Sequence, residues 1–127
     1  MNWFVVFDTD FLSSFLKIDR LQLVREFYQV ETATIAPAVY YEIAPTTLTP
    51  KLAGMFWVQI QAPQSAAIER LRSYSEYNLL GPGEQESIAL ALPVQSAILL
   101  GSDNRARRFA QSVGVRAVNI FTFLLAC

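Results

Sequence analysis

The chain has 127 residues, of which 53% are hydrophobic and 17% are charged. This composition excludes a disordered protein and predicts a single folded domain over residues 1–127 with a core of its own. The sequence contains no histidine, which excludes Ser-His-Asp and Cys-His catalysis and the usual zinc sites built from histidine and cysteine. The net charge of −1 disfavours an ordinary nucleic-acid-binding domain, because such domains are usually basic.

The N-terminal segment MNWFVVFDTD has no positively charged region and soon reaches Asp8, so no signal peptide is expected. Apolar runs elsewhere are short and are interrupted by charge or proline, which excludes a membrane span. The single cysteine, Cys127, cannot form an intramolecular disulfide, in keeping with a reducing compartment. We therefore expect a cytoplasmic protein.

In the first half of the chain, short apolar runs alternate with helical patterns. We predict a buried strand at WFVVF (3–7), helices at FLSSFLKI (11–18) and DRLQLVREFY (19–28), a strand at ATIAP (33–37), a helix at PAVYYEIA (37–44) and a loop or short helix at TLTPKLAG (47–54). Asp19 is the expected N-cap of the second helix, and Pro37 suits the first turn of the third.

The second half continues the alternation. The pattern predicts a strand at 56–63, a helix at 65–80 with Ile68, Leu71 and Leu79 facing inward, a helix after the Gly-Pro-Gly turn at 81–83, a strand at 97–103, a helix at 104–114, a strand at 115–119 and a final short helix at IFTFLLAC. We expect a three-layer α/β/α fold, a parallel sheet of four to five strands with helices on both faces.

Two aspartates directly follow predicted strands. Asp8 ends the first strand, and Asp103 ends AILLGS. Because ligands of open α/β sheets bind beyond the carboxyl ends of the strands, both residues are expected at the edge where a site would form. The alternative interpretation, that each is only a helix N-cap, stays open.

Glu42 lies inside the apolar helix AVYYEIA, three residues after Val39 and next to Ile43. Helical spacing therefore places it at the border of the buried stripe. A carboxylate there is costly unless it is paired or bound to a metal ion. The competing interpretation is a solvated residue at the edge of the stripe.

The stretch GPGEQESIALAL (81–92) begins a helix with two glutamates close together. Acids in a first turn are favoured by the helix dipole, which is one explanation for both. Glu84 shares the face of Ile88 and Ala91, whereas Glu86 points about 200° around the helix from Glu84. We therefore predict that Glu84 faces the cluster of acids and that Glu86 faces solvent.

Four acids from four segments, all directed at one sheet edge, predict a cation site. Since every available ligand atom is oxygen, the ion is expected to be Mg²⁺ or Mn²⁺. Such an ion activates water and neutralises a phosphodiester during hydrolysis. Without it, four neighbouring carboxylates would repel one another.

The ordered segments VVFDTDFLSSFLKI, IAPAVYYEI, GEQESIALAL and LLGSDNRARRFAQSVGVRAV resemble the PIN-domain ribonucleases, the group that includes the VapC toxins. The last two segments are most similar to a compact prokaryotic subgroup, with a Gly-Glu helix start and an Asp-x-x-Ala-Arg element. The resemblance covers most of the chain and implies an endoribonuclease that acts as the toxin of a toxin–antitoxin pair, with RNA as substrate and an antitoxin protein as partner.

The resemblance also implies residue roles. The acid tetrad of the family corresponds to Asp8, Glu42, Glu84 and Asp103, which would hold one or two Mg²⁺ or Mn²⁺ ions. Its small hydroxyl positions correspond to Thr9 and Ser102, and Asp10 is a weaker match. The third acid is glutamate where many relatives have aspartate, Asn104 stands where a second aspartate often follows, and the chain stops soon after the fifth strand.

Arginines cluster near the end of the chain. Arg105 and Arg108 are candidates for phosphate contacts, and the alternative is that they form a solvated helix face. The apolar C-terminal segment, with Phe121, Phe123 and Leu124, predicts a homodimer interface.

Two other functions remain open. The first is a catalytically silent PIN-fold module that binds a protein partner, to which the aromatic residues Tyr40, Tyr41 and Trp57 would contribute. The second is a phosphatase of the haloacid-dehalogenase type, suggested by VFDTDF. That class needs a later lysine and a paired-acid loop, whereas the only lysines are Lys17 and Lys51.

Overall fold

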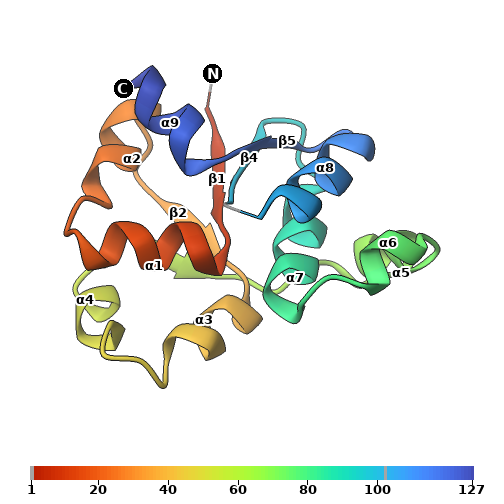
Figure 1. Ribbon diagram of the computed structural model, residues 1–127, viewed down its shortest axis with the longest axis horizontal. Helices are drawn as coiled ribbons and strands as arrows, with labels where there is room; N and C mark the ends of the chain where they lie inside the picture. Colours follow the sequence, from red (N-terminus) through yellow and green to blue (C-terminus); the bar gives the residue numbers. More distant parts are fainter. Residues whose placement is uncertain (1, 102) are drawn as a thin grey trace.

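Five parallel strands form one sheet in the computed structural model, which describes residues 2–101 and 103–127. Across the sheet the order is β3-β2-β1-β4-β5 (Figure 1). The strands are β1 (Phe4–Phe7), β2 (Ala33–Ile35), β3 (Val58–Ile60), β4 (Ala97–Leu100) and β5 (Arg116–Val118). The predicted parallel sheet is therefore confirmed, with five strands.

Helices pack against both faces of the sheet, which confirms the predicted α/β/α layers (Figure 1). They are α1 (Thr9–Lys17), α2 (Gln22–Tyr28), α3 (Pro37–Ile43), α4 (Thr49–Ala53), α5 (Ser65–Arg72), α6 (Ser75–Asn78), α7 (Pro82–Ala91), α8 (Asn104–Ser112) and α9 (Ile120–Ala126). Helices α1, α2 and α9 lie together on one side, and α5 to α8 lie on the other. Helix α3 contacts both α1 and α7. None of the described helices is long and apolar enough to cross a membrane.

The central strands β1 and β4 are the most apolar segments of the sheet, FVVF and AILL. Both lie between other strands, and the helices on either side of the sheet cover both of their faces, as continuous apolar sequence predicts. Their register pairs Phe7 with Leu100. The residues that follow, Asp8 and Gly101, therefore leave the sheet side by side at its carboxyl edge.

Two predicted helices differ from the observed ones. Residue Asp19 does not cap a helix: it has a left-handed backbone (φ 56°) and pairs with Lys51 at 3.1 Å, and α2 begins only at Gln22. The predicted helix 65–80 is split, because Tyr74 adopts an extended conformation between α5 and α6.

This break changes which residues of the second piece face inward. After Arg72 the rings of Tyr74 and Tyr77 pack against Phe109 of α8, so the second piece does not continue the helical phase of α5. Tyr77 and Leu80 are buried instead, whereas Leu79, predicted to face inward, is 69% exposed. Leu71 is buried as expected.

An aromatic cluster joins α9 to the rest of the domain. The ring of Phe123 is 1% exposed and contacts four other rings, those of Phe11, Phe15, Phe27 and Tyr28, with centroids 5.4 to 6.0 Å apart. The expectation that Phe123 needs cover from a second molecule is therefore wrong, since its own chain covers it. Trp57, which a protein-binding module would need at its surface, is also buried.

Candidate active site at the carboxyl edge of the sheet

Asp8 leaves the end of β1 and caps α1. Its backbone N–H donates to the carbonyl of Leu100 at 3.0 Å, and its Oδ1 accepts from the N–H of Phe11 at 3.0 Å. Asp8 is therefore the N-cap of α1, but the cap uses only one of its two carboxylate oxygens. The other oxygen, Oδ2, lies beside Gly101, where an added Cβ would come within 2.6 Å of it. A glycine at the end of β4 therefore makes room for this carboxylate.

Glu42 reaches the same edge from α3. Its Oε2 accepts from the hydroxyl of Thr9 at 2.5 Å, and its Oε1 accepts from the N–H of Gly83 at 3.1 Å. The side chain is exposed, whereas Val39 and Ile43 of α3 are buried, so Glu42 is the solvated residue at the edge of the stripe that the competing interpretation described. Glu42 is nevertheless held in place, because each of its oxygens has a protein donor.

Glycine is needed again at Gly83. A Cβ there would lie 2.8 Å from Glu42 Oε1 and 3.0 Å from Thr9 Oγ1. The first turn of α7 can therefore approach the carboxylate of α3 closely enough to bind it only without a side chain at this position. The Gly-Pro-Gly turn thus starts α7 and also lets its first turn bind the carboxylate of Glu42.

Glu84 lies one residue further along α7 and is half-buried. Its Oε1 accepts from the N–H of Gly81 at 3.0 Å. Burial raises the pKa of Glu84, and the negative charges of Asp103 and Asp10 raise it further, while the N–H of Gly81 and the positive charge of Arg105 oppose the rise. Glu84 therefore shares its surroundings with both aspartates.

Glu86 does not face solvent, and that prediction is wrong. Its Oε1 accepts from the N–H of Ala38 at 2.9 Å, in the first turn of α3, and the side chain is half-buried. The N-cap residue of α3 is Ala36, which has no side-chain acceptor, so a carboxylate from α7 supplies the missing one.

Asp103 caps α8, and its Oδ1 accepts from the N–H of Ala106 at 2.9 Å. It is half-buried, as is Thr9, whereas Arg105 and Arg108 are exposed on α8. Ser102 lies outside the described residues.

Together these elements enclose a pocket of about 220 Å³ at the carboxyl edge. Its lining includes four acids, and two glycines and a threonine complete it: Asp8, Thr9, Asp10, Glu42, Gly81, Gly83 and Glu84. Asp103 is not part of the lining. Within residues 2–101 and 103–127, no three acids lie close enough together to enclose a metal ion.

The donor chemistry of this pocket fits a hard divalent cation. All of its charged groups are carboxylates, the ligands that Mg²⁺ and Mn²⁺ prefer. Because Gly83 and Gly101 have no side chains, the carboxylates of Glu42 and Asp8 have room to lie at the pocket. Sequence reasoning missed the role of the glycines, although Gly81, Gly83 and Gly101 all stand within three residues of a candidate acid.

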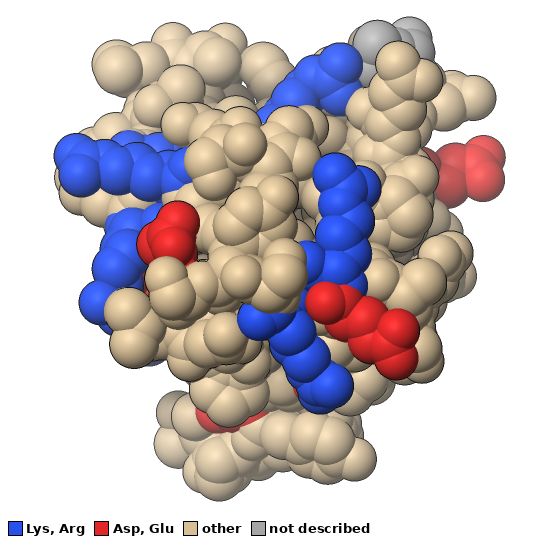
Figure 2. All heavy atoms as spheres, turned by 90° about the vertical axis from the view of Figure 1, so that its right-hand side faces the viewer, with Lys and Arg blue, Asp and Glu red and all other residues tan. Residues whose placement is uncertain are grey.

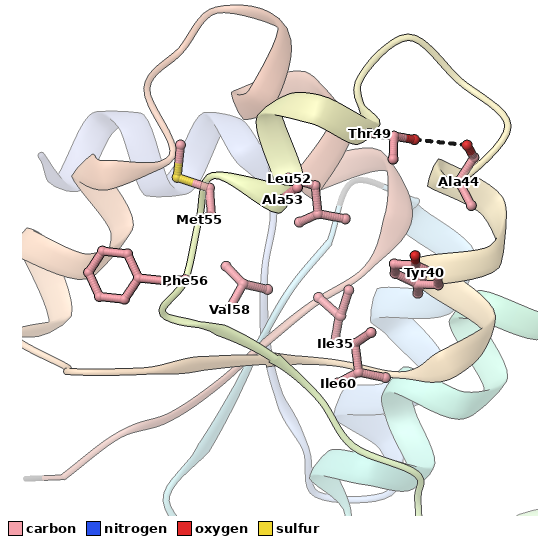
Figure 3. A pocket seen from close by; sticks show the side chains of 10 residues that line it. All are labelled: Ile35, Tyr40, Ala44, Thr49, Leu52, Ala53, Met55, Phe56, Val58 and Ile60. Carbon is pink, nitrogen blue, oxygen red and sulfur yellow. Dashed lines mark hydrogen bonds between the residues drawn. The ribbon is translucent and has the colours of Figure 1, made fainter.

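A second cavity, of about 270 Å³, has a different character (Figure 3). It lies between α3, α4 and the edge strand β3, and its lining is mostly apolar: Ile35, Tyr40, Ala44, Thr49, Leu52, Ala53, Met55, Phe56, Val58 and Ile60. The Thr49 hydroxyl turns away to donate to the Ala44 carbonyl at 2.8 Å. Since no acid or base lines this cavity, it offers no groups for hydrolysis.

Comparisons with known proteins agree with this architecture. The crystal structure of PAE2754 from Pyrobaculum aerophilum is similar with a TM-score of 0.61 and 15% sequence identity, over 99% of this chain and 97% of that chain. Likeness at that identity shows the fold alone. No curated protein matches the chain. A family model described as a PIN domain matches residues 4–126, nearly the whole sequence, and the chain therefore belongs to the PIN-domain family.

Proposed function

We propose that this protein is a metal-dependent endoribonuclease that hydrolyses RNA phosphodiesters at the acid pocket. PIN domains are generally nucleases, and they generally use divalent metal ions. The observation that carries the proposal is the pocket itself, where Asp8, Glu42 and Glu84 from three separate segments line one space. In a metal-free protein these like charges repel one another, and a bound cation would offset that repulsion.

The residues proposed to hold Mg²⁺ or Mn²⁺ are Asp8, Glu42, Glu84 and Asp103. When bound, the ion would supply a nucleophile from water and would neutralise the charge that develops on the phosphate. Thr9 is a positioning residue in this scheme rather than a substrate ligand, because its hydroxyl donates to Glu42. The hydroxyl and the N–H of Gly83 fix the direction of the Glu42 carboxylate before any ion binds.

Substrate attraction also depends on charge. The pocket is anionic and so is RNA, so a bound divalent ion, which reverses the local sign, would strengthen binding. Arg105 and Arg108, exposed on α8, would supply further attraction to phosphate groups at the rim. Affinity is therefore expected to fall steeply as salt increases.

Cleavage of an end-labelled single-stranded RNA tests the proposal. Wild-type protein should cut in Mg²⁺ or Mn²⁺, stop when a chelator is added, and recover when the metal is restored. Asp8→Asn and Asp103→Asn should abolish cleavage while keeping the fold, and Glu86→Gln, which retains an acceptor for Ala38, should cut as the wild type does. Cleavage that survives in Asp8→Asn or in the chelator would mean that the pocket is not the catalyst.

Association with protein partners is proposed separately. By its family resemblance the protein would be the toxin of a toxin–antitoxin pair, and by its exposed apolar residues it would form a homodimer. Phe121, Leu124 and Leu125 on α9 are 76%, 45% and 89% exposed, which is unfavourable in a free monomer. Light scattering at tens of micromolar should give a dimer in the wild type and a monomer in Leu125→Asp. A monomeric wild type would exclude the dimer.

The second candidate function is a protein-binding module that does not cut RNA. The observation in its favour is the apolar cavity of Figure 3, where Phe56 and Ile60 remain 81% and 53% exposed. Because this cavity and the acid pocket have separate linings, Asp8→Asn distinguishes the two functions: it would remove cleavage and leave a binding function intact.

A further inference from the structure

A third cavity, of about 490 Å³, lies between α6 and α8. Its lining combines apolar side chains with two arginines: Glu76, Leu79, Asn104, Arg105, Arg108, Phe109 and Ser112. Most of the surface it offers is apolar, although the rim is charged. Neither the acid pocket nor the family assignment accounts for this combination.

Leu79 provides the open apolar surface of this cavity. It is 69% exposed, because the break between α5 and α6 turns Tyr77 inward in its place. Phe109 closes the floor and is itself packed against Tyr74 and Tyr77, with ring centroids 5.6 and 5.8 Å away. Two rings therefore support the floor from beneath, whereas Leu79 at the cavity stays largely exposed to water.

The two arginines at the rim are available to bind anions. Arg105 and Arg108 lie three residues apart on α8 and so project from the same side of the helix. Among the described residues, neither forms an ion pair within 4.0 Å. Figure 2 shows this side of the molecule, where the blue basic side chains cover more of the surface than the red acidic ones. The overall charge of −1 thus conceals a locally basic face.

The cavity adjoins the candidate active site along the chain and in space. Asp103 caps α8, and the next two residues, Asn104 and Arg105, line the cavity. Arg105 is also near enough to Glu84 for its charge to act on that carboxylate. A strand of RNA with a phosphate at the acid pocket would therefore have a neighbouring nucleotide within reach of α8.

We propose that this cavity binds one unpaired nucleobase of the RNA, with its flat face against Leu79, above the buried ring of Phe109, and with the adjoining phosphates on Arg105 and Arg108. This inference rests on the proposed ribonuclease function and specifies it, since a base inside a duplex has no free face to offer. Since every nucleobase has a flat face, such a contact does not depend on which base is bound. Glu76 would repel a phosphate and can accept a hydrogen bond only, so it suits the N–H groups at a base edge.

The proposal can be tested by RNA binding in an Asp8→Asn background, which is expected not to cut. Fluorescence anisotropy in Mg²⁺ compares a labelled single-stranded oligoribonucleotide with versions in which successive nucleotides lack the base. One abasic position should weaken binding by about tenfold. Adding Leu79→Ser should reduce that difference to less than about twofold, because the surface that receives the base is gone.

Two controls separate the base contact from other effects. Ile18→Ser removes a similarly exposed aliphatic side chain at the end of α1, which lies on the other side of the molecule from α6 and α8, and should leave the tenfold difference intact. Arg105→Gln should weaken the normal and the abasic RNA equally and make binding less dependent on salt. Circular dichroism and thermal melts check that each variant is folded.

Each outcome decides the proposal. Equal binding of normal and abasic RNA by the Asp8→Asn protein, or a full difference retained in Leu79→Ser, would overturn it. Absence of RNA binding would overturn it as well and would leave the cavity to a protein partner. Cleavage by the wild-type protein is measured separately: RNA cutting with no base effect refutes the cavity alone, whereas a base effect without any cutting refutes the nuclease and leaves the cavity in place.

Discussion

The acid pocket and the aromatic cluster around Phe123 lie at different places in the same domain and are held together in opposite ways. Both gather residues from segments that are distant in sequence. The cluster fills space, with five rings packed edge to face or stacked. The pocket keeps space open: glycines make room for carboxylates, and hydrogen bonds rather than packing orient them. Stability and function should therefore respond separately to mutation.

The largest effect on stability is expected in the aromatic cluster. Phe123→Ala removes a fully buried ring and should lower the free energy of unfolding by about 3–5 kcal/mol. Urea denaturation followed by fluorescence measures this change. The matched control is Phe56→Ala, the same substitution at a ring that is 81% exposed, which should cost less than about 1 kcal/mol. Similar losses in both variants would mean that the cluster does not anchor α9.

The opposite pattern is expected at the pocket. Gly83→Ala puts a methyl group against Glu42 and Thr9. Because the ends of these side chains can move aside, stability should fall by about 1 kcal/mol or less. Cleavage should fall by about a hundredfold, since displacement of a catalytic group by roughly 1 Å has an effect of that size.

Gly54→Ala is the control for that variant. Its new methyl group would meet the carbonyl of Lys51 at 3.5 Å, an ordinary contact, and should alter neither stability nor cleavage. If Gly83→Ala instead unfolds the protein, or cuts RNA normally, the glycine does not position the carboxylate as we infer.

The sequence alone predicted the frame of the molecule better than its details. The order of strands and helices follows from apolar runs and turn residues, and the strand ends correctly locate Asp8 at the carboxyl edge. Those signals are local. The break at Tyr74 could not be read from them, because SYSEYN is compatible with a helix until Tyr77 is seen to be the buried residue.

The candidate site shows the same division between local and tertiary information. Helical phase correctly distinguished Glu84 from Glu86, since only Glu84 lines the pocket. Helical phase did not predict the surroundings of Glu86, because its partner, the N–H of Ala38, is 48 residues away in the sequence. The exposure of Glu42 and the clearances at Gly83 and Gly101 likewise depend on how α3, α7 and β4 approach each other.

The smallest effect on stability and cleavage is expected at Glu86, which does not line the acid pocket. Glu86→Gln should change stability by less than about 0.5 kcal/mol, because the amide oxygen can still accept from Ala38 and only a charge near the start of α3 is lost. Glu86→Ala leaves that N–H without its acceptor and should cost about 1 kcal/mol. Thermal melts compare the two variants. A large loss of cleavage in Glu86→Gln would place this residue in the catalytic pocket after all.

Binding of the metal ion is the most direct test of the central claim that the acid pocket is a cation site. Crystals of the wild-type protein soaked in Mn²⁺ should give an anomalous difference peak among Asp8, Glu42, Glu84 and Asp103, with carboxylate oxygens at about 2.0–2.6 Å from it. The same soak of Asp8→Asn crystals should give a weaker peak or none. A wild-type crystal with Mn²⁺ bound elsewhere and no peak in this pocket would contradict the account.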